Sequence, residues 1–499
     1  MGQASGWRSW SWLAPAFVIY SLCRIPSFFE PHWYTDEAGY ASTARAVLRG
    51  LPLYSVAWTN KPPLQIWAVA IPLWLFGPSE AGLHALTFIS GLVALTAVAF
   101  VAGRLLSTPR AIGATVAFAL AIGLPFVEAE LIVPESLLIA PVTWAGALMV
   151  LRFARGEAAA NDAATEKSGR KAVSLVLLAA LAGALVGVGL GIQQTVLADA
   201  VVFALVIVLA RRWSALAAYL LAMAAVVAAW ILPAIAVAGA PAVSFALVGF
   251  YRTYAAFSVP STPLGLGLRA LGPPLALVGA VIARREGNRA WPLWLWACAD
   301  LAVSAVANRP YPHFLIPALA PAVLAVASLP RPRVPWPVRR RLGTTAMVAA
   351  FLITGNFALV AGLDLSTVQA YAVWPASHVV KNVEPWSALP SLTSPGDEAV
   401  AKWIRDNGYS DSSAVVWSSS AWIYMLADLD VSLPAAPIYN DVIIYGSGRA
   451  LALQVESMQP ELIVTSDEAT RQWPDIVPLL TREYQLVYSS GYDHVYVRG

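Results

Sequence analysis

Apolar runs of about 20 residues recur along this chain from Leu13 to Leu363. Each run is long enough to cross a bilayer whose hydrocarbon core is roughly 30 Å thick. Hydrophobic residues make up 58% of the 499 positions and charged residues only 12%. A soluble protein with this composition would have too few polar residues to cover its apolar helices. The sequence therefore predicts an all-α polytopic membrane protein.

The distribution of arginines and lysines sets the topology. Residues 64–77 form a short apolar segment that contains Pro72 and that could cross the membrane or lie along its surface. If it does not cross, every later basic loop falls on the cytoplasmic side, as the positive-inside rule requires. We therefore expect about 11 spans, on the same rule. Their approximate ranges are 13–29, 81–101, 111–127, 135–151, 172–191, 195–210, 214–238, 264–283, 291–307, 311–329 and 343–362.

The last part of the chain has a different character. From Asp364 onward there are 7 basic and 16 acidic residues, whereas the preceding part is strongly basic. Helix-like and strand-like runs alternate here. DEAVAKWIRDNG is helix-like, and SAVVWSSSAWIYML, ELIVTS and EYQLVYSSGYDHVYVRG alternate strand-like runs with turns. We expect two domains: a transmembrane catalytic domain at 1–363 and a small α/β extracytoplasmic domain at 364–499. The basic residues lie at span ends, so no nucleic-acid partner is expected.

The stretch between Tyr34 and Leu64 is unusually rich in charge for a segment between apolar runs. It holds the carboxylates Asp36 and Glu37 and the cation Lys61. Alanines at helical spacing predict a short amphipathic helix over 36–49 that lies on the membrane surface. In a chain with so few charged residues, a charged cluster beside a membrane span is a hypothesis for a functional site, so this loop is the first candidate.

With this topology most acids of the membrane domain fall at the outer ends of its spans. The acids are Glu30, Asp36, Glu37, Glu80, Glu128, Glu130 and Glu135, and the outer cationic or titratable groups are Arg45, Arg49, Lys61, Arg252, Arg269, Arg309 and His313. Departure of a phosphate favours lysine or arginine, and attack by a hydroxyl favours a carboxylate base. An outer cavity that holds both suits such a transfer.

Several motifs resemble the first outer loop of a family of GT-C glycosyltransferases. They are Asp36-Glu37-x-x-Tyr40, Gly50-x-Pro52-x-Tyr54, Lys61-Pro62-Pro63-Leu64 and Leu75-Phe76-Gly77, and NRPYPHFLIPALAPAVL at 308–324 is similar to a late span of the family. The family includes protein mannosyltransferase-like and aminoarabinose-transferase-like enzymes. The resemblance covers the membrane part as a whole and is specific only in the first 80 residues.

This resemblance implies an enzyme that takes a sugar from a polyprenyl-phosphate donor on the outer face of a bacterial plasma membrane. The acceptor would be a glycan, lipid or protein hydroxyl. Asp36 would be the catalytic base with Glu37 beside it, and Lys61 would bind the lipid phosphate. The segment Pro134-Glu135-Ser136-Leu137-Leu138 matches the second outer loop of the family, which makes Glu135 the second acid. Tyr40, Arg252, Arg309 and His313 are candidate substrate-binding residues.

Each assignment has a structural alternative. Asp36, Glu37 and Glu135 could be ordinary acids in the first turn of a helix, Lys61 could extend to lipid headgroups, and Arg252 could be an interfacial anchor. Arg309 and His313 could serve packing or lipid contact. Glu128 or Glu130 could replace Glu135, and any of the three could hold a divalent cation. The five histidines show no metal-ligand spacing, so a divalent cation held by these acids is the one cofactor left open.

A secondary transporter or lipid flippase is the rival function from another class. Asp199, Asp300 and the glycine-rich segment LAGALVGVGLGIQQ are the features that favour it. Transporters place functional charges near the membrane midplane, often within inverted repeats. Here the charges gather at the outer ends of the spans and no repeat is visible, which favours the enzyme.

Overall fold

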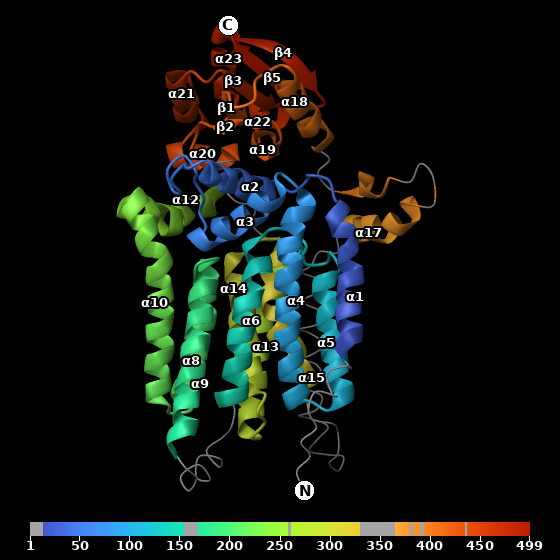
Figure 1. Cartoon of the computed structure of the whole chain (residues 1–499), viewed down its shortest axis with the longest axis vertical. Helices are drawn as coiled ribbons and strands as arrows, with labels where there is room; N and C mark the ends of the chain where they lie inside the picture. The colour runs from blue at the N-terminus through green and yellow to red at the C-terminus, as the bar shows by residue number, and fades with distance from the viewer. Residues whose placement is uncertain are drawn as a thin grey trace.

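The computed structural model describes residues 13–153, 168–257, 261–329, 365–378, 380, 384–389, 394–434 and 437–499. It has two layers along its long axis, a bundle of long helices and a smaller domain built around a β-sheet (Figure 1). Short helices lie crosswise between the two layers. The fold is therefore mostly helical with a small α/β domain at its C-terminal end, as the sequence predicts.

The bundle contains both long and short apolar helices that run side by side (Figure 1). They are α1 (Ala14–Arg24), η2 (Ile25–Phe29), α4 (Glu80–Leu105), α5 (Thr108–Gly123), α6 (Pro134–Phe153), α8 (Ser168–Leu190), η3 (Gln194–Val196), α9 (Leu197–Leu209), α10 (Trp213–Ala238), α13 (Pro263–Arg285), α14 (Trp291–Ala307), η5 (Pro312–Leu315) and α15 (Ile316–Ala327). Within the described ranges, five helices are long and apolar enough to cross a membrane: α4, α6, α8, α10 and α13. The predicted span at 343–362 lies outside the described residues, so the total of eleven stays a prediction.

The glycine-rich segment of α8 serves close helix packing. A methyl group added at Gly183 would lie 2.0 Å from the Tyr219 carbonyl oxygen of α10, and one added at Gly187 would lie 2.8 Å from Val226. Such small residues let helices in a membrane approach each other closely. This segment therefore has a packing role that requires no transport function.

Two short helices follow α1, and neither runs along the bundle. They are α2 (Thr35–Leu48) and α3 (Pro63–Phe76), and both lie across the bundle end that faces the sheet domain (Figure 1). On α3, Trp67, Ile71 and Trp74 leave 37%, 55% and 74% of their surface exposed. An exposed apolar stripe at i, i+4 and i+7 is typical of a helix lying in a membrane interface. Segment 64–77 thus has the non-crossing placement that the arginine distribution predicts.

The prediction that α2 lies on the membrane surface is wrong, because the C-terminal domain covers this helix. Arg45 donates hydrogen bonds to the carbonyl oxygens of Tyr424 at 2.8 Å and Leu429 at 3.0 Å. Arg49 forms ion pairs with Asp411 and Asp428, both at 2.8 Å. These arginines attach α2 to the acidic C-terminal domain and are therefore occupied outside the outer cavity.

The C-terminal domain is a five-stranded mixed sheet with helices around it. Its strand order is β2-β1-β3-β5-β4, in which β1 pairs in parallel with β2 and β3, and β5 pairs antiparallel with β3 and β4. The strands are β1 (Ser413–Trp417), β2 (Asp430–Val431), β3 (Leu462–Ser466), β4 (Tyr484–Ser490) and β5 (Asp493–Arg498). The helices in and before this domain are α17 (Leu365–Ser377), α18 (Ser394–Asp406), α19 (Trp422–Leu426), α20 (Ile438–Tyr445), α21 (Gly448–Met458), α22 (Asp467–Gln472) and α23 (Val477–Glu483).

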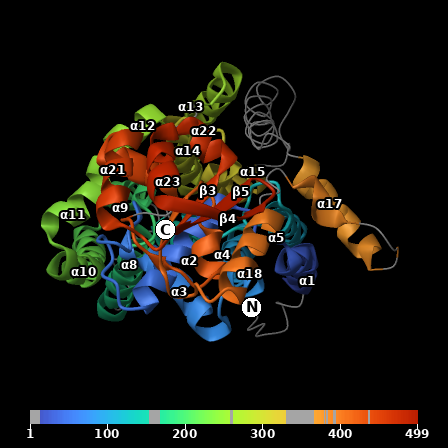
Figure 2. The same cartoon turned by 90° about the horizontal axis from the view of Figure 1, so that it is seen from above.

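The predicted helix at α18 and the predicted strands β1, β3, β4 and β5 are present. One part of the prediction is wrong, because the strand-like run WIYML forms the short helix α19. The Tyr424 hydroxyl of α19 accepts a 2.8 Å hydrogen bond from the Val416 amide of β1, so this helix turns its aromatic side chain back onto the sheet. Seen from above, the sheet domain covers α2, while α17 projects beyond it (Figure 2). The domain boundary at residue 364 stays a prediction.

Candidate active site

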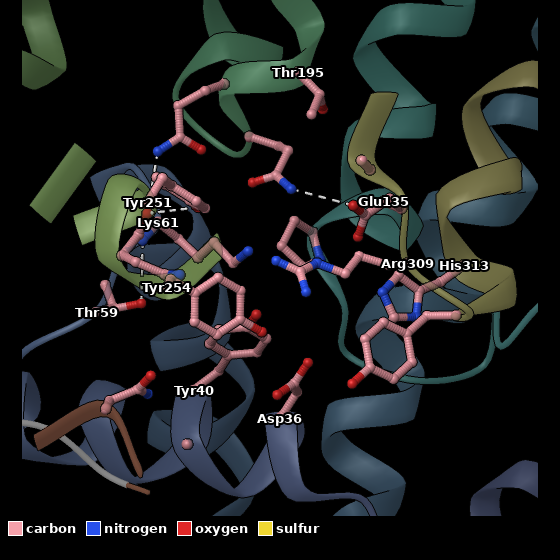
Figure 3. A pocket seen from close by; sticks show the side chains of 18 of the residues that line it. Asp36, Tyr40, Thr59, Lys61, Glu135, Thr195, Tyr251, Tyr254, Arg309 and His313 are labelled. Atoms are coloured by element: carbon pink, nitrogen blue, oxygen red, sulfur yellow. Dashed lines mark hydrogen bonds between the residues drawn. The ribbon is translucent and has the colours of Figure 1, made fainter. Parts of the chain in front are cut away.

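A cavity of 540 Å³ lies where the bundle, the crosswise helices and the C-terminal domain meet. It draws on segments that are far apart in the sequence, including α12 (Phe250–Phe257) and the first turn of α20. Its polar lining residues are Asp36, Tyr40, Thr43, Thr59, Asn60, Lys61, Glu135, Gln193, Gln194, Thr195, Tyr251, Tyr254, Arg309, Tyr311, His313, Tyr439 and Asn440. Figure 3 shows the labelled side chains converging on the space between Asp36 and Glu135.

Two carboxylates lie on opposite sides of this cavity. Asp36 is in the first turn of α2 and points into the cavity, and Glu135 is in the first turn of α6 (Figure 3). Glu135 is buried and accepts a 3.1 Å hydrogen bond from the Gln193 side-chain amide. Burial raises the pKa of Asp36, and Lys61 opposes this shift. A raised pKa makes Asp36 a stronger proton acceptor than an exposed aspartate, which suits a general base.

Lys61 comes from the loop before α3, which is held in place by hydrogen bonds. The Tyr54 hydroxyl donates to the Lys61 carbonyl oxygen at 2.7 Å. Burial acts to lower the pKa of Lys61, but Tyr251, Glu135 and Asp36 act to raise it, and the net shift is upward. The side chain therefore keeps its charge. Among the described residues it has no ion-pair partner, which leaves its ammonium available for an anion.

Arg309 is the second cation of the cavity. Helix α14 ends at Asn308, whose left-handed backbone (φ of 47°) turns the chain so that Arg309 reaches into the cavity (Figure 3). Its guanidinium lies 5.0 Å from the centroid of the Tyr254 ring. In the part of the chain that the structure describes, Arg309 forms no ion pair. A stacked guanidinium with free N–H groups is well suited to bind a phosphate.

Tyrosines and amides complete the lining, and sequence reasoning missed most of them. The Tyr251 hydroxyl donates to the Asn60 carbonyl oxygen at 3.1 Å, and the Gln194 side chain donates to the same oxygen at 3.1 Å. Two signals could have found them. Tyr251 and Tyr254 flank the noted Arg252 at helical spacing, and Gln193-Gln194 is a polar pair at the end of an apolar run.

The predicted site residues fall into two groups. Those that line the cavity are Asp36, Tyr40, Lys61, Glu135, Arg309 and His313. Glu37 and Arg252 do not line it. Glu37 is fully buried and turned toward α4, because successive helical residues point about 100° apart. Arg252 is exposed on the outer side of α12, whereas its neighbours Tyr251 and Tyr254 face the cavity.

Glu128, Glu130 and Glu135, the three acids considered for the second carboxylate, have different surroundings in the structure. Only Glu135 among them lines the cavity. Glu128 forms a hydrogen bond with His313, in which its Oε2 atom lies 2.5 Å from the Nδ1 atom of the imidazole ring. Glu130 is buried near Glu30, and burial raises its pKa to about 8. These carboxylates do not gather around one point, so the expected divalent cation at this place stays a prediction.

Comparison with known proteins gives a clear result for the fold. No protein-family model matches the chain, and no curated protein sequence matches it. The structure superposes on that of ArnT from Cupriavidus metallidurans bound to undecaprenyl phosphate with a TM-score of 0.61, over 97% of each chain and at 13% identity. The chain has the fold of ArnT. The apo form of that protein superposes with the same TM-score of 0.61.

The ArnT fold confirms the helical bundle with a small α/β domain that the resemblance of the first outer loop implies. The oligosaccharyltransferase of Archaeoglobus fulgidus in its apo form is also similar, with a TM-score of 0.50 and 13% identity over 99% of this chain and 75% of that protein. Nearly the whole chain follows the ArnT architecture, including the sheet domain. The likeness therefore extends beyond the first 80 residues in which the motifs are specific.

Proposed function

We propose that this protein is a membrane glycosyltransferase that transfers a sugar from a polyprenyl-phosphate donor to a hydroxyl group of an envelope glycan, lipid or protein. One observation carries the proposal. Lys61 and Arg309, which form no ion pair within the described residues, share a 540 Å³ cavity with the carboxylates Asp36 and Glu135. That combination provides both a phosphate-binding region and a proton acceptor.

In the proposed reaction the bond between the sugar's anomeric carbon and the phosphate oxygen breaks. Polyprenyl phosphate leaves with both electrons of that bond, and Lys61 and Arg309 stabilise its charge. The acceptor hydroxyl forms the new bond to the anomeric carbon and gives its proton to Asp36. Glu135, held by Gln193, orients the sugar hydroxyls across the cavity. No cofactor takes part in these steps.

The likeness to ArnT supports the donor class, because the ArnT structure has undecaprenyl phosphate bound. The acceptor is proposed to enter beneath the C-terminal domain, since Tyr439 and Asn440 of α20 bring that domain into the cavity lining. A bacterial plasma membrane with the C-terminal domain outside is the location proposed for this chain.

The test is an assay of the purified full-length chain in liposomes with a panel of polyprenyl-phosphate sugars and an envelope extract as acceptor. We expect free polyprenyl phosphate to accumulate in step with sugar on the acceptor. Transfer of phosphate along with the sugar would indicate a phosphotransferase instead. Flux of the labelled lipid without a covalent product would indicate a transporter or flippase.

The proposed orientation can be tested by cysteine labelling in intact cells. The native Cys23 and Cys298 are first replaced by alanine, and exposed serines are then replaced singly by cysteine. Ser107→Cys, between α4 and α5, should resist an impermeant thiol reagent, whereas Ser457→Cys, on α21, should react within minutes. Labelling of the first and protection of the second would reverse the topology and overturn the outer-face assignment.

A further inference from the structure

A second cluster of titratable side chains lies outside the cavity, on the opposite side of α2. Glu37 of α2 and the pair Glu80 and His84 of α4 each offer one ligand atom, and these atoms all lie within 4.8 Å of one another. The Nε2 atom of His84 is 3.2 Å from Oε1 of Glu37 and 3.7 Å from Oε1 of Glu80. All three side chains are at least 95% buried.

Several of these buried polar atoms have no hydrogen-bond partner among the residues that the structure describes. They are Oε2 of Glu37 and both Oε1 and Oε2 of Glu80, together with Nε2 of the neighbouring His32. Burying a carboxylate without hydrogen bonds or a counter-charge is strongly unfavourable. Two such carboxylates that face each other are stabilised by a positive charge between them or by a shared proton.

His84 and His32 each turn one ring nitrogen toward the carboxylates, where a cation could bind. The Nδ1 atom of His84 is 2.5 Å from the Ser27 carbonyl oxygen, so Nδ1 carries a proton and Nε2 is the ring nitrogen that faces the carboxylates. The Nδ1 atom of His32 pairs with Glu398 of α18 at 3.3 Å, and its Nε2 is 3.8 Å from Oε2 of Glu80. A metal-bound histidine usually donates its other ring N–H to a carbonyl or carboxylate oxygen in this way, which fixes the orientation of the ring.

We propose that Glu37, Glu80 and His84 bind a divalent transition-metal ion of the zinc class, with His32 as the fourth ligand. Ligand bonds of 2.0–2.2 Å in a tetrahedral site put neighbouring ligand atoms about 3.3 Å apart. Nε2 of His84 lies 3.2 Å and 3.7 Å from oxygens of Glu37 and Glu80, close to that value, whereas Nε2 of His32 lies 3.8 Å from the other oxygen of Glu80 and has to move further to complete the set. Two carboxylates and two neutral imidazoles balance a charge of +2 and give the nitrogen and oxygen set that zinc accepts.

This ion is structural, because its ligands turn away from the cavity. It joins the first turn of α2, the first turn of α4 and the loop between η2 and α2, and through Glu398 it reaches the C-terminal domain. Glu37 follows Asp36 directly, so the ion also fixes the backbone that carries the proposed base. Glu37 then acts as a metal ligand and a positioning residue.

The test is the metal content of the full-length protein, purified in detergent with an affinity tag that does not bind metals. We expect about one zinc ion per chain after incubation with zinc chloride and gel filtration. Glu80→Gln and His84→Gln should each lower the bound zinc at least tenfold, as expected for loss of a ligand. His494→Gln, which removes a partly buried histidine paired with Asp467 in the sheet domain, is the matched control and should leave the zinc content unchanged.

A second measurement keeps the proposal testable if the variants fail to fold. Removal of the ion from the wild-type protein with a chelator should lower the melting temperature, and zinc but not magnesium should restore it. Cobalt substitution should give the visible absorption bands of a tetrahedral site. A wild-type protein that holds no stoichiometric divalent ion under these conditions would overturn the proposal. It would mean that a doubly protonated His84 supplies the positive charge.

Discussion

Asp36→Asn is expected to lower the rate of sugar transfer by about 10²–10⁴-fold, the usual range for loss of a general base. Asparagine has the same shape as aspartate but cannot accept the proton of the acceptor hydroxyl. The change is confined to one side chain that lines the cavity, so the protein should insert and fold normally. The measurement is the initial rate of release of polyprenyl phosphate in liposomes with saturating donor.

The matched control is Asp406→Asn, which removes a carboxylate that is exposed and pairs with Lys402 on α18. It should leave the rate unchanged. The pH profile gives an independent check: because burial raises the pKa of Asp36, the wild-type rate should rise with pH until that carboxyl is ionised. An Asp36→Asn variant that transfers sugar at the wild-type rate would remove Asp36 from the proposed mechanism.

Lys61→Gln is expected to lower the transfer rate by about 10²–10³-fold, the scale seen when one charge-stabilising donor is lost. The leaving phosphate would lose a cation that forms no ion pair in the described part of the chain. Because the net pKa shift of Lys61 is upward, its charge persists to alkaline pH, and the wild-type rate should not fall between neutral and mildly alkaline pH. Steady-state kinetics with varied donor concentration would measure this.

Lys402→Gln is the control for the loss of a lysine, because Lys402 is exposed on α18 and far from the cavity lining. Lys61→Arg should recover part of the activity, since it restores the charge but changes the geometry of the donors. If Lys61→Gln weakened donor binding without changing the rate at saturation, Lys61 would bind the carrier equally in the ground state and in the transition state. Unchanged kinetics would leave Arg309 as the sole phosphate-binding cation of the proposal.

Much of the architecture follows from physical rules that operate on the sequence alone. The length of apolar runs predicts the bundle, and the arginine distribution predicts that segment 64–77 stays at the surface, where α3 lies. The motif residues Asp36 and Lys61 reach one cavity because the loop between α2 and α3 returns over the same end of the bundle. Local sequence patterns are therefore enough to predict the helical bundle and the two residues Asp36 and Lys61 of the cavity.

The errors come from contacts between distant segments. The alanines of α2 suggest a membrane-facing surface, but they pack under a domain that begins some 350 residues later. The spacing of Glu80 and His84 at i and i+4 on one helix is a metal-ligand spacing, although the histidines considered alone show none. Neither Tyr439 nor Asn440 has a local signal, because their place in the cavity depends on how the sheet domain docks.

The position of α2 has a consequence for the order in which the protein is made. Its Ser42 hydroxyl donates to the Ala421 carbonyl oxygen at 2.7 Å, and its Arg45 reaches Tyr424, so the helix with the first carboxylate is clamped by residues synthesised nearly four hundred positions later. The cavity gains Tyr439 only after that domain has been synthesised. A partly translated chain thus holds the motif residues without the complete cavity.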